Sequence, residues 1–406
     1  MRLRMILSIL SMVLVLELVA IPNTITAELQ WTIETVGPAW GYTFIAIDSN
    51  GYPHISYLIG SPATQIYIAY ARKDSTGWHI ETIDESSLSV DAYTSITLDS
   101  NGYPHLCYAG SNGNLRYAYK DAAGWHIEDV TSEPGTEGDH CSIALDSGGY
   151  PHITYDDYLI TRPDMFGKYA YKDTTGWHIR SFDDIAGTTS LALDSDNYPH
   201  ICYPYSLFSP PYFTLRYARW MGSYWDIQTV DSQGYPVNYC SLALDSTGNP
   251  HISYYVFATD DLRYARWTGS GWNIQTVDGA GIVGRYPSLA LDGAGNPHIS
   301  YYDATNGDLK YARWTGNGWD IQTVDAAGDV GRYTSITLDR AGNPHISYYD
   351  YTNRVLKYAK GKVIVVTPTP TNTPIPTPTP AQTPTPTPGP MDKFIYLPLV
   401  LRNYSP

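Results

Sequence analysis

The chain has 406 residues, with 25 basic and 40 acidic side chains, and its formal net charge is −15. Its Lys and Arg residues are dispersed, which excludes the clustered basic face that a nucleic-acid backbone requires. Tyrosine is abundant, with 37 residues, and each phenol joins an apolar ring to a polar tip. This composition favours short, half-buried strands and surfaces that bind polar ligands such as sugars.

Residues 1–27 have the layout of a secretory signal peptide. Arg2 and Arg4 precede an apolar run over residues 5–20, as in the charged and hydrophobic regions of such peptides. The alternative is an uncleaved membrane anchor, but the run is short and contains Glu17. Its removal would leave 23 basic and 39 acidic side chains. We therefore expect a secreted bacterial protein with no transmembrane helix in its mature chain.

A repeat of about 48 residues dominates the chain. A Pro-His pair recurs at spacings of 47 to 51 residues, and a tryptophan recurs at spacings of 47 to 52. Two independent markers thus indicate seven units. The pairs begin at Pro53, Pro104, Pro151, Pro199, Pro250, Pro297 and Pro344, and the tryptophans are Trp31, Trp78, Trp125, Trp177, Trp225, Trp272 and Trp319.

Each unit reads as four strands separated by turns. In one unit these are residues 288–292, 298–302, 309–314 and 319–324, and Gly and Asn are enriched between them. No stretch has the apolar spacing of a helix. Radial stacking of such sheets buries both faces of each sheet. The repeat therefore predicts an all-β fold, a seven-bladed β-propeller of four-stranded antiparallel blades, over residues 28–366.

Two segments compete to complete the last blade, whose third strand is predicted at 356–359. Residues 31–36 read as a fourth strand that precedes the first complete unit. Residues 362–366 could instead follow the third strand through a tight turn. We prefer residues 31–36, because ring closure between the two ends of a propeller joins its first and last blades.

The four cysteines occupy two equivalent repeat positions. Cys107 and Cys202 lie three residues after the proline of their units, and Cys141 and Cys240 stand just before the next first strand. Only the pairing of Cys107 with Cys141 and of Cys202 with Cys240 respects this equivalence. We expect these two disulfides in an exported protein. The alternative, a four-cysteine zinc site, would require four blades to converge on one ion.

Most histidines and many aspartates recur in every unit, and we interpret them as architectural. The repeated histidine is expected to form a hydrogen bond within its blade, with the Asp that ends the first strand as one candidate partner. Each such Asp opens a turn, where a carboxylate caps backbone N–H groups. The histidines are His54, His105, His152, His200, His251, His298 and His345, and the aspartates are Asp48, Asp99, Asp146, Asp194, Asp245, Asp292 and Asp339.

This Asp-turn unit, for example LDSNGYPHLCY at 98–108 and LDRAGNPHISYYD at 338–350, resembles the tandem repeats of bacterial secreted propellers grouped with sialidase-like and Asp-box proteins. The resemblance covers residues 31–359 and implies the architecture. It does not imply sialidase activity, because the Ser-x-Asp-x-Gly-x-x-Trp box is absent. The repeating arginines also share one register instead of forming a separate triad; they are Arg116, Arg216 and Arg263.

Function is expected where the units differ, at the loops that enter the first strands. A ring of tyrosines with two neighbouring arginines could stack on a carbohydrate or an anionic polymer and donate hydrogen bonds to it. The alternative is that the tyrosines only fill the mouth of the channel. The candidate ligand-binding residues are Tyr42, Tyr93, His140, Tyr239, Arg285, Tyr286, Arg332 and Tyr333. Longer insertions at 155–166 and 203–214 are a second candidate surface, or simply decorated hairpins.

The C-terminal region leaves the repeat pattern. Residues 367–390 alternate Pro and Thr, which predicts an extended linker. Residues 391–406 include the segment YLPLVLR, which is too short to span a membrane. This ending resembles the tails of secreted bacterial repeat proteins and implies a sorting or cell-surface retention tag. A disordered tail with an apolar end is the alternative.

The sequence favours a non-enzymatic extracellular recognition or scaffold propeller that binds a glycan or a protein. No catalytic motif is present, and we expect no cofactor and no metal site. The first alternative is a glycan-active hydrolase or lyase that uses carboxylates in the variable loops. Those carboxylates would be Asp156, Asp157, Asp260 and Asp261. The second alternative is a purely structural component of the cell surface.

Overall fold

The computed structural model describes residues 26–366, except for gaps at 62, 87, 89–91, 112, 132–135, 138–139, 159–164, 186, 207–212 and 234–238. Ala27–Val365 form one compact unit. Residues 1–25 of the predicted signal peptide (1–27), the predicted linker over 367–390 and the predicted tail over 391–406 lie outside the described residues. Within the described residues, no helix is both long and apolar enough to cross a membrane.

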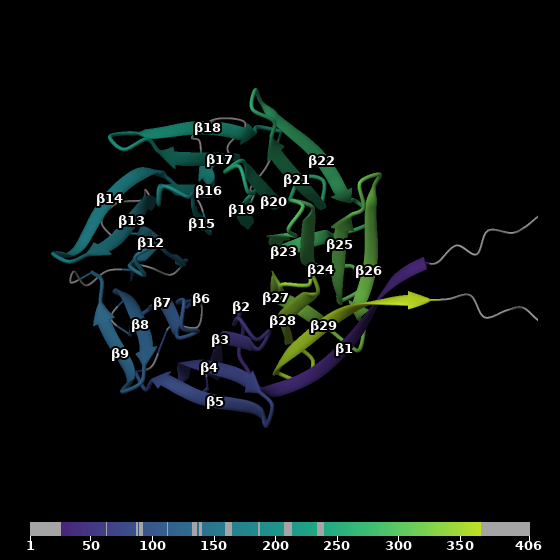
Figure 1. Ribbon diagram of the computed structural model, residues 1–406, viewed down its shortest axis with the longest axis horizontal. Coiled ribbons are helices and arrows are strands. Elements are labelled where there is room, and N and C mark those ends of the chain that lie inside the picture. The colour runs from purple at the N-terminus through teal and green to yellow at the C-terminus, as the bar shows by residue number, and fades with distance from the viewer. Residues whose placement is uncertain are drawn as a thin grey trace, which may run out of the picture. The chain divides into compact units, whose positions relative to one another are not determined.

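The compact unit is a β-propeller, as predicted: seven antiparallel sheets of four main strands surround one axis (Figure 1). Blade 1 contains β2 (Thr43–Ile47), β3 (Pro53–Gly60), β4 (Ile66–Asp74) and β5 (Gly77–Asp84). Blade 2 contains β6 (Thr94–Leu98), β7 (Pro104–Ala109), β8 (Leu115–Asp121) and β9 (Gly124–Asp129). Blade 3 contains β11 (Ser142–Leu145), β12 (Pro151–Tyr158), β13 (Met165–Asp173) and β14 (Gly176–Asp184), with β10 (Thr136–Glu137) added beside β12.

Blades 4 to 7 follow the same order from the axis outward. Blade 4 contains β15 (Ser190–Leu193), β16 (Pro199–Ser206), β17 (Phe213–Trp220) and β18 (Trp225–Asp231), and blade 5 contains β19 (Cys240–Leu244), β20 (Pro250–Val256), β21 (Asp261–Trp267) and β22 (Trp272–Asp278). Blade 6 contains β23 (Val283–Leu291), β24 (Pro297–Asp303), β25 (Asp308–Trp314) and β26 (Trp319–Asp325). Blade 7 contains β27 (Val330–Leu338), β28 (Pro344–Asp350), β29 (Val355–Val366) and β1 (Thr26–Pro38).

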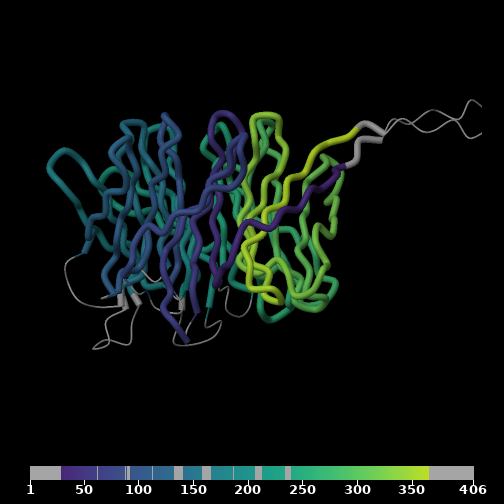
Figure 2. Tube along the Cα trace, turned by 90° about the horizontal axis from the view of Figure 1, so that it is seen from below, coloured from purple at the N-terminus to yellow at the C-terminus, as the bar shows by residue number. Residues whose placement is uncertain are grey.

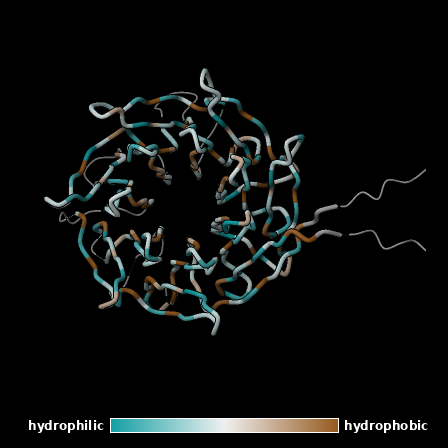
Figure 3. Tube along the Cα trace, in the orientation of Figure 1, coloured by the Kyte–Doolittle hydropathy of each residue, from teal (hydrophilic) through white to brown (hydrophobic). Residues whose placement is uncertain are grey.

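Burial within a blade follows the position of the strand. The second strand lies between two others and between neighbouring blades, and every residue of β24 is buried. The fourth strand is an outer edge, and β26 is buried only at its last two residues. Hydrophobic segments accordingly recur in the strands of every blade (Figure 3), and in side view the strands run between the two ends of the ring (Figure 2).

The Asp turns cap backbone groups as expected. Oδ1 of Asp292 accepts hydrogen bonds from the N–H groups of Ala294 at 2.9 Å and Asn296 at 2.8 Å. The same pair of bonds forms at the other six aspartates. These carboxylates therefore hold the turns between first and second strands, and we call the end of the ring that carries them the Asp-turn face.

The repeated histidines form their hydrogen bonds within each blade, which confirms that prediction. Nδ1 bonds to a tyrosine hydroxyl of the third strand at 2.5–2.6 Å in all seven blades. The candidate Asp is a second partner, because Nε2 lies 3.3–3.9 Å from it in five blades. The tyrosines are Tyr70, Tyr117, Tyr169, Tyr217, Tyr264, Tyr311 and Tyr358.

These tyrosines also join the blades. Each packs edge to face against a repeated tryptophan of the next blade, for example Tyr70 with Trp125 at a centroid distance of 5.3 Å. The seven pairs lie at 5.1–5.6 Å. Such contacts contribute roughly 0.5–1.5 kcal/mol each beyond the area that they bury. The hydrophobic clusters accordingly lie between neighbouring blades.

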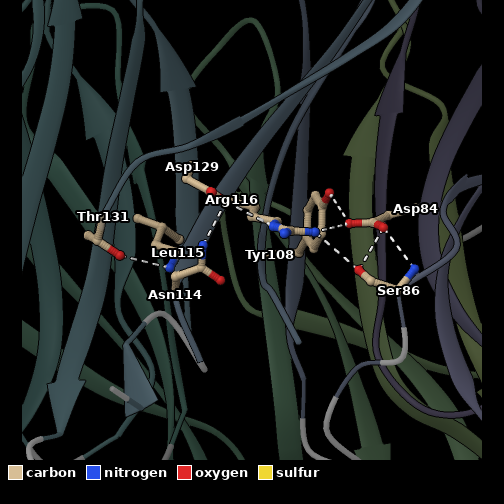
Figure 4. A network of polar contacts seen from close by, with 8 residues as sticks. All are labelled: Asp84, Ser86, Tyr108, Asn114, Leu115, Arg116, Asp129 and Thr131. Atoms are coloured by element: carbon tan, nitrogen blue, oxygen red, sulfur yellow. Dashed lines mark hydrogen bonds and ion pairs between the residues drawn. The ribbon is translucent and has the colours of Figure 1, made fainter. Parts of the chain in front are cut away.

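A carboxylate latch crosses most blade interfaces, as Figure 4 shows between blades 1 and 2. Oδ2 of Asp84 accepts hydrogen bonds from the Tyr108 hydroxyl at 2.9 Å and from Arg116 at 2.6 Å. Equivalent latches centre on Asp183, Asp231, Asp278 and Asp325. Between blades 7 and 1 the equivalent positions hold Gly37 and Ala69, and the buried Tyr57 hydroxyl has no partner among the described residues.

The N-terminal strand closes the ring. β1 pairs with β29 and forms the outer strand of blade 7. β29 is continuous to Val366, so residues 362–366 extend the third strand and form no fourth one. Trp31 Nε1 donates to Gln322 at 3.1 Å, and Glu34 accepts from Lys73 and Trp78 of blade 1. The preference for residues 31–36 is therefore confirmed.

Both predicted disulfides are present. Cys107 pairs with Cys141, and Cys202 pairs with Cys240. The first joins blades 2 and 3, and the second joins blades 4 and 5. Because every cysteine is oxidised, the zinc alternative has no thiolate ligands left.

Candidate functional site

The predicted tyrosines meet at the mouth of the central channel. Their rings form a continuous arc in which the centroid distances are 4.2 Å for His140 and Tyr93, 3.6 Å for Tyr93 and Tyr42, and 4.0 Å for Tyr42 and Tyr333. Tyr333 lies 4.4 Å from Tyr286, and Tyr286 lies 4.7 Å from Tyr239. Six aromatic rings from six blades thus contact one another, and we call them the aromatic arc.

The aromatic arc leaves little space for a ligand. The cavity that it lines has a volume of about 90 Å³, whereas pockets for small ligands hold about 300–1,000 Å³. Burial, strengthened by neighbouring phenols, raises the pKa of Tyr239 to about 12 and that of Tyr93 well above its usual range. These two phenols are therefore neutral at physiological pH. Their role in ligand binding stays a prediction.

Two tyrosines of the arc have left-handed backbone conformations. φ is 54° at Tyr286 and 53° at Tyr333, and the strand register shifts at the same places, between Arg285 and Ser288 and between Arg332 and Ser335. For a bulky residue such a conformation costs about 1–3 kcal/mol. The cost accompanies a bulge that brings both phenols into the arc.

The two predicted arginines do not line this cavity. Arg332 makes a two-pronged ion pair with Asp329, at 2.9 Å and 2.6 Å, and lies 4.0 Å from the Tyr351 ring centroid. Arg285 lies 5.8 Å from the Tyr255 ring centroid. The structure therefore separates both guanidinium groups from the arc. Arg285 contacts Tyr255 of β20, and Arg332 contacts Tyr351, which follows β28.

His140 is held by a buried carboxylate. Its Nδ1 lies 3.0 Å from Oδ2 of Asp156, and its backbone N–H donates to Oδ1 of Asp156 at 3.0 Å. The Asp156 side chain is only 3% exposed. Asp156 therefore orients the only histidine that stands outside the repeat register.

The other loop carboxylates suggested for a glycan-active enzyme also have partners or lie at a rim. Asp157 lies 3.3 Å from Lys168 Nζ. Asp260 accepts a hydrogen bond from the Tyr255 hydroxyl. Asp261 pairs with Val256 at the end of blade 5's central hairpin. These carboxylates belong to contacts within two separate hairpins, one in blade 3 and one in blade 5.

A much larger groove lies on the Asp-turn face, between blades 4 and 5. Its volume is about 630 Å³, which falls within the range of small-ligand pockets. Blade 4 contributes its Asp turn and residues of β17 and β18, and blade 5 contributes its own Asp turn and β21. The polar and aromatic lining includes Asp194, Asp196, Tyr217, Arg219, Asp226, Gln228, Asp245, Asn249 and Trp267.

Arg219 is turned toward the inner wall of this groove. Its Nη2 donates to Oδ2 of Asp194 at 3.1 Å, and the Asp194 side chain is 7% exposed. In blade 6 the equivalent Arg313 pairs with Asp320 on the neighbouring strand at 3.0 Å. In blade 4 the corresponding carboxylate, Asp226, accepts a hydrogen bond from Gln228 at 2.9 Å and has no ion pair among the described residues.

Trp267 provides the aromatic wall. It is half-buried at the end of β21, and its ring meets Trp272 edge to face at 5.5 Å. An indole fixed by a second indole is a rigid surface on which an apolar face of a ligand can stack. Trp220 holds the equivalent position in blade 4, next to Trp225 at 5.2 Å, but does not line the groove.

Related grooves lie at two other blade interfaces. The groove between blades 6 and 7 holds about 570 Å³ and includes Arg313 and Trp314. The groove between blades 1 and 2 holds about 350 Å³ and includes Arg72 and Lys120. Sequence reasoning missed these sites because it assigned the Asp-turn face to the framework. The available signal was that Arg-Trp pairs occur only in blades 4, 5 and 6, at Arg219, Arg266 and Arg313 and the tryptophans that follow them.

No protein-family model and no curated protein matches the chain. Among solved structures, an ulvan lyase with a bound saccharide is 13% identical, covers 81% of this chain and 95% of its own, and has a TM-score of 0.56. A triple arginine-to-alanine mutant of AofleA from Arthrobotrys oligospora is 12% identical over 74% of this chain and 91% of its own, with a TM-score of 0.50. A fucose-specific lectin from Aleuria aurantia is 13% identical over 72% and 96%, with a TM-score of 0.48. At such identities the similarity shows the propeller fold alone.

Proposed function

We propose that the protein is an extracellular, non-enzymatic carbohydrate-binding propeller that holds a saccharide in the groove between blades 4 and 5. One observation carries the proposal. The groove has a volume of about 630 Å³, and its lining includes a fixed indole, Trp267, the guanidinium of Arg219 and the carboxylate of Asp226.

These groups match the two surfaces of a sugar ring. The C–H face of a pyranose is apolar and stacks on an indole, and its hydroxyl groups exchange hydrogen bonds with charged side chains. Arg219 is positioned by Asp194, and Asp226 by Gln228. Binding would therefore cost little reordering of these side chains, which favours affinity.

An extracellular location is consistent with the two disulfides, because disulfides persist in oxidising compartments. The predicted signal peptide supports the same assignment. Retention at the cell surface through residues 391–406 stays a prediction, as does the linker over 367–390. A protein ligand or a purely structural role remains an outcome that the binding experiment distinguishes.

The test is a glycan array with the mature chain, followed by calorimetric titration of the best ligand. Trp267→Ala should weaken binding at least tenfold, because stacking on the indole is lost. Trp220→Ala is the matched control, since it removes an indole from the equivalent edge-to-face pair of blade 4 outside the groove. It should change the affinity less than twofold.

Variants of the aromatic arc separate the two candidate sites. Tyr286→Ala and Tyr333→Ala should leave glycan binding unchanged if the groove is the site. Binding that is lost in these variants and retained in Trp267→Ala would transfer the site to the channel mouth. Absence of binding to every glycan would refute the proposed function, and turnover of a bound glycan would favour the enzyme alternative.

A further inference from the structure

The groove between blades 4 and 5 contains more carboxylates than cations. Asp194, Asp196, Asp226 and Asp245 line it together with a single guanidinium, that of Arg219. Arg219 is paired with Asp194. The other three carboxylates have no Lys or Arg partner among the described residues, so the groove has a negative potential.

The pKa values of two of these carboxylates, Asp194 and Asp245, lie below their usual range, so both are ionised at physiological pH. Burial would raise the pKa of Asp245, but hydrogen bonds from Thr247 and Asn249 outweigh it and hold the pKa well below its usual range. The pKa of Asp194 is lowered in the same way by the Tyr198 backbone N–H and by His200, against the effect of burial. Asp196 is exposed and Asp226 half-buried, which leaves both able to face a ligand across the groove.

Of the three grooves between neighbouring blades, only this one has a negative balance, although an opening beside blades 1, 2 and 7 also gathers Asp48, Asp99 and Asp339 around a single Arg340. Between blades 1 and 2 the lining combines Asp48 and Asp74 with Arg72, Lys73 and Lys120. Between blades 6 and 7 the lining contains one aspartate and one arginine, Asp292 and Arg313. The repeat alone therefore does not impose an acidic groove.

The differences arise from residues that vary between blades. The position of Asp196 is alanine in blades 6 and 7, at Ala294 and Ala341. The position of Asp226 is asparagine in blade 5, at Asn273. Because the same fold accepts neutral residues at both positions, neither carboxylate is required by the architecture.

We propose that this groove selects a saccharide that bears an amino group and rejects acidic sugars, an inference that rests on the proposed carbohydrate-binding function. An ammonium group on the sugar ring would be attracted by Asp196 and Asp226. The indole of Trp267 adds a cation–π contribution when the ammonium lies over its face. A uronate or a sulfated sugar would instead be repelled by the same carboxylates.

The test compares three oligosaccharides of equal length: oligomers of glucosamine, of N-acetylglucosamine and of galacturonate. Calorimetric titration with the mature chain at low ionic strength should give the tightest binding for glucosamine and none for galacturonate. Raising the salt concentration should weaken the glucosamine complex and leave the N-acetylglucosamine complex unchanged, because salt screens exposed charges.

A double variant removes the charge and keeps the fold. Asp196→Ala with Asp226→Asn introduces residues that other blades already carry at these positions. Its affinity for the glucosamine oligomer should fall about two- to fivefold per carboxylate, as expected for exposed ion pairs. Its affinity for the N-acetylglucosamine oligomer should stay within twofold.

The outcomes separate this inference from the function on which it rests. If galacturonate binds as tightly as glucosamine, or if the double variant binds glucosamine unchanged, the charge selectivity is refuted. If N-acetylglucosamine binds best and Trp267→Ala abolishes that binding, the carbohydrate site stands and the selectivity for an amino group falls. If no oligomer binds, or if binding does not depend on Trp267, both fail.

Discussion

Acidification between pH 6.5 and pH 4 should destabilise the propeller through its repeated histidines. All seven are buried and bonded through Nδ1 to a buried or nearly buried tyrosine. Burial lowers the pKa to about 4 at His54, His200, His298 and His345. It lowers the pKa of the other three in the same direction.

The direction of this stability change follows from the protonation states of histidine in the folded and unfolded chains. A histidine in the unfolded chain has a pKa of about 6.5, so the unfolded state binds protons first as the pH falls. Stability is therefore complete above pH 6.5 and is lost progressively down to about pH 4. A pKa of about 4 in the folded state corresponds to about 1–2 kcal/mol lost per histidine at pH 5.5 and about 3 kcal/mol at full loss.

Four such histidines would cost about 6 kcal/mol at pH 5.5, which is comparable with the total stability of many domains. The turn aspartates affect stability only at lower pH. Burial would raise the pKa of Asp194, but its hydrogen bonds lower it, so its contribution is lost only as the pH falls below the unfolded value of about 3.9. Histidine and aspartate effects are thus separable by pH.

The assay is urea unfolding at intervals from pH 7 to pH 4.5, with the pH slope of the free energy giving the protons taken up on unfolding. His298→Gln should reduce this uptake by up to one proton near pH 5. Uptake of less than one proton across the whole window would refute the reasoning.

Three further predictions concern the architecture. Tyr57→Phe should raise the free energy of unfolding by about 1 kcal/mol, since it removes an unpaired buried hydroxyl. Tyr301→Phe should instead lower the free energy of unfolding, because it removes the 2.7 Å hydrogen bond to Asp278. Urea titrations in which both variants change stability in the same direction would contradict this prediction. Reduction of the disulfides, whose partners are 34 and 38 residues apart, should cost about 4 kcal/mol each, measured by calorimetry with and without reductant; an unchanged melting temperature would count against it. Deletion of residues 28–37 should lower the melting temperature sharply because β1 is the outer strand of blade 7, whereas deletion of 362–366 should lower it less; equal effects in a thermal shift assay would argue against the observed closure.

The residues shared by every unit were predictable because they recur at equivalent positions of the repeat. Seven copies of one pattern identified the blades, and the equivalent positions of Cys107 and Cys202 identified the disulfides. The histidines were read as architectural for the same reason. Their main partner was not foreseen: the tyrosine hydroxyl of the third strand lies 12 to 17 residues further along, and the pattern alone named only the Asp.

The candidate site depended on contacts between blades. The tyrosines of the arc were foreseen as a group, but their close packing on one another follows from the narrow channel mouth and from the bulges at Tyr286 and Tyr333. Arg285 and Arg332 directly precede Tyr286 and Tyr333 in the sequence, yet both arginines lie outside the cavity. Adjacent residues in a strand point to opposite faces, and this separates them.

By itself, the sequence determined the architecture: a closed seven-bladed ring, its two disulfides and the framework roles of its repeated His and Asp. Only the tertiary structure decided where a ligand could lie. The groove between blades 4 and 5 is lined by both Asp226 and Trp267, two residues from different sheets. The groove is formed by two neighbouring blades, and its charge comes from Asp196 and Asp226, at positions where other blades carry neutral residues.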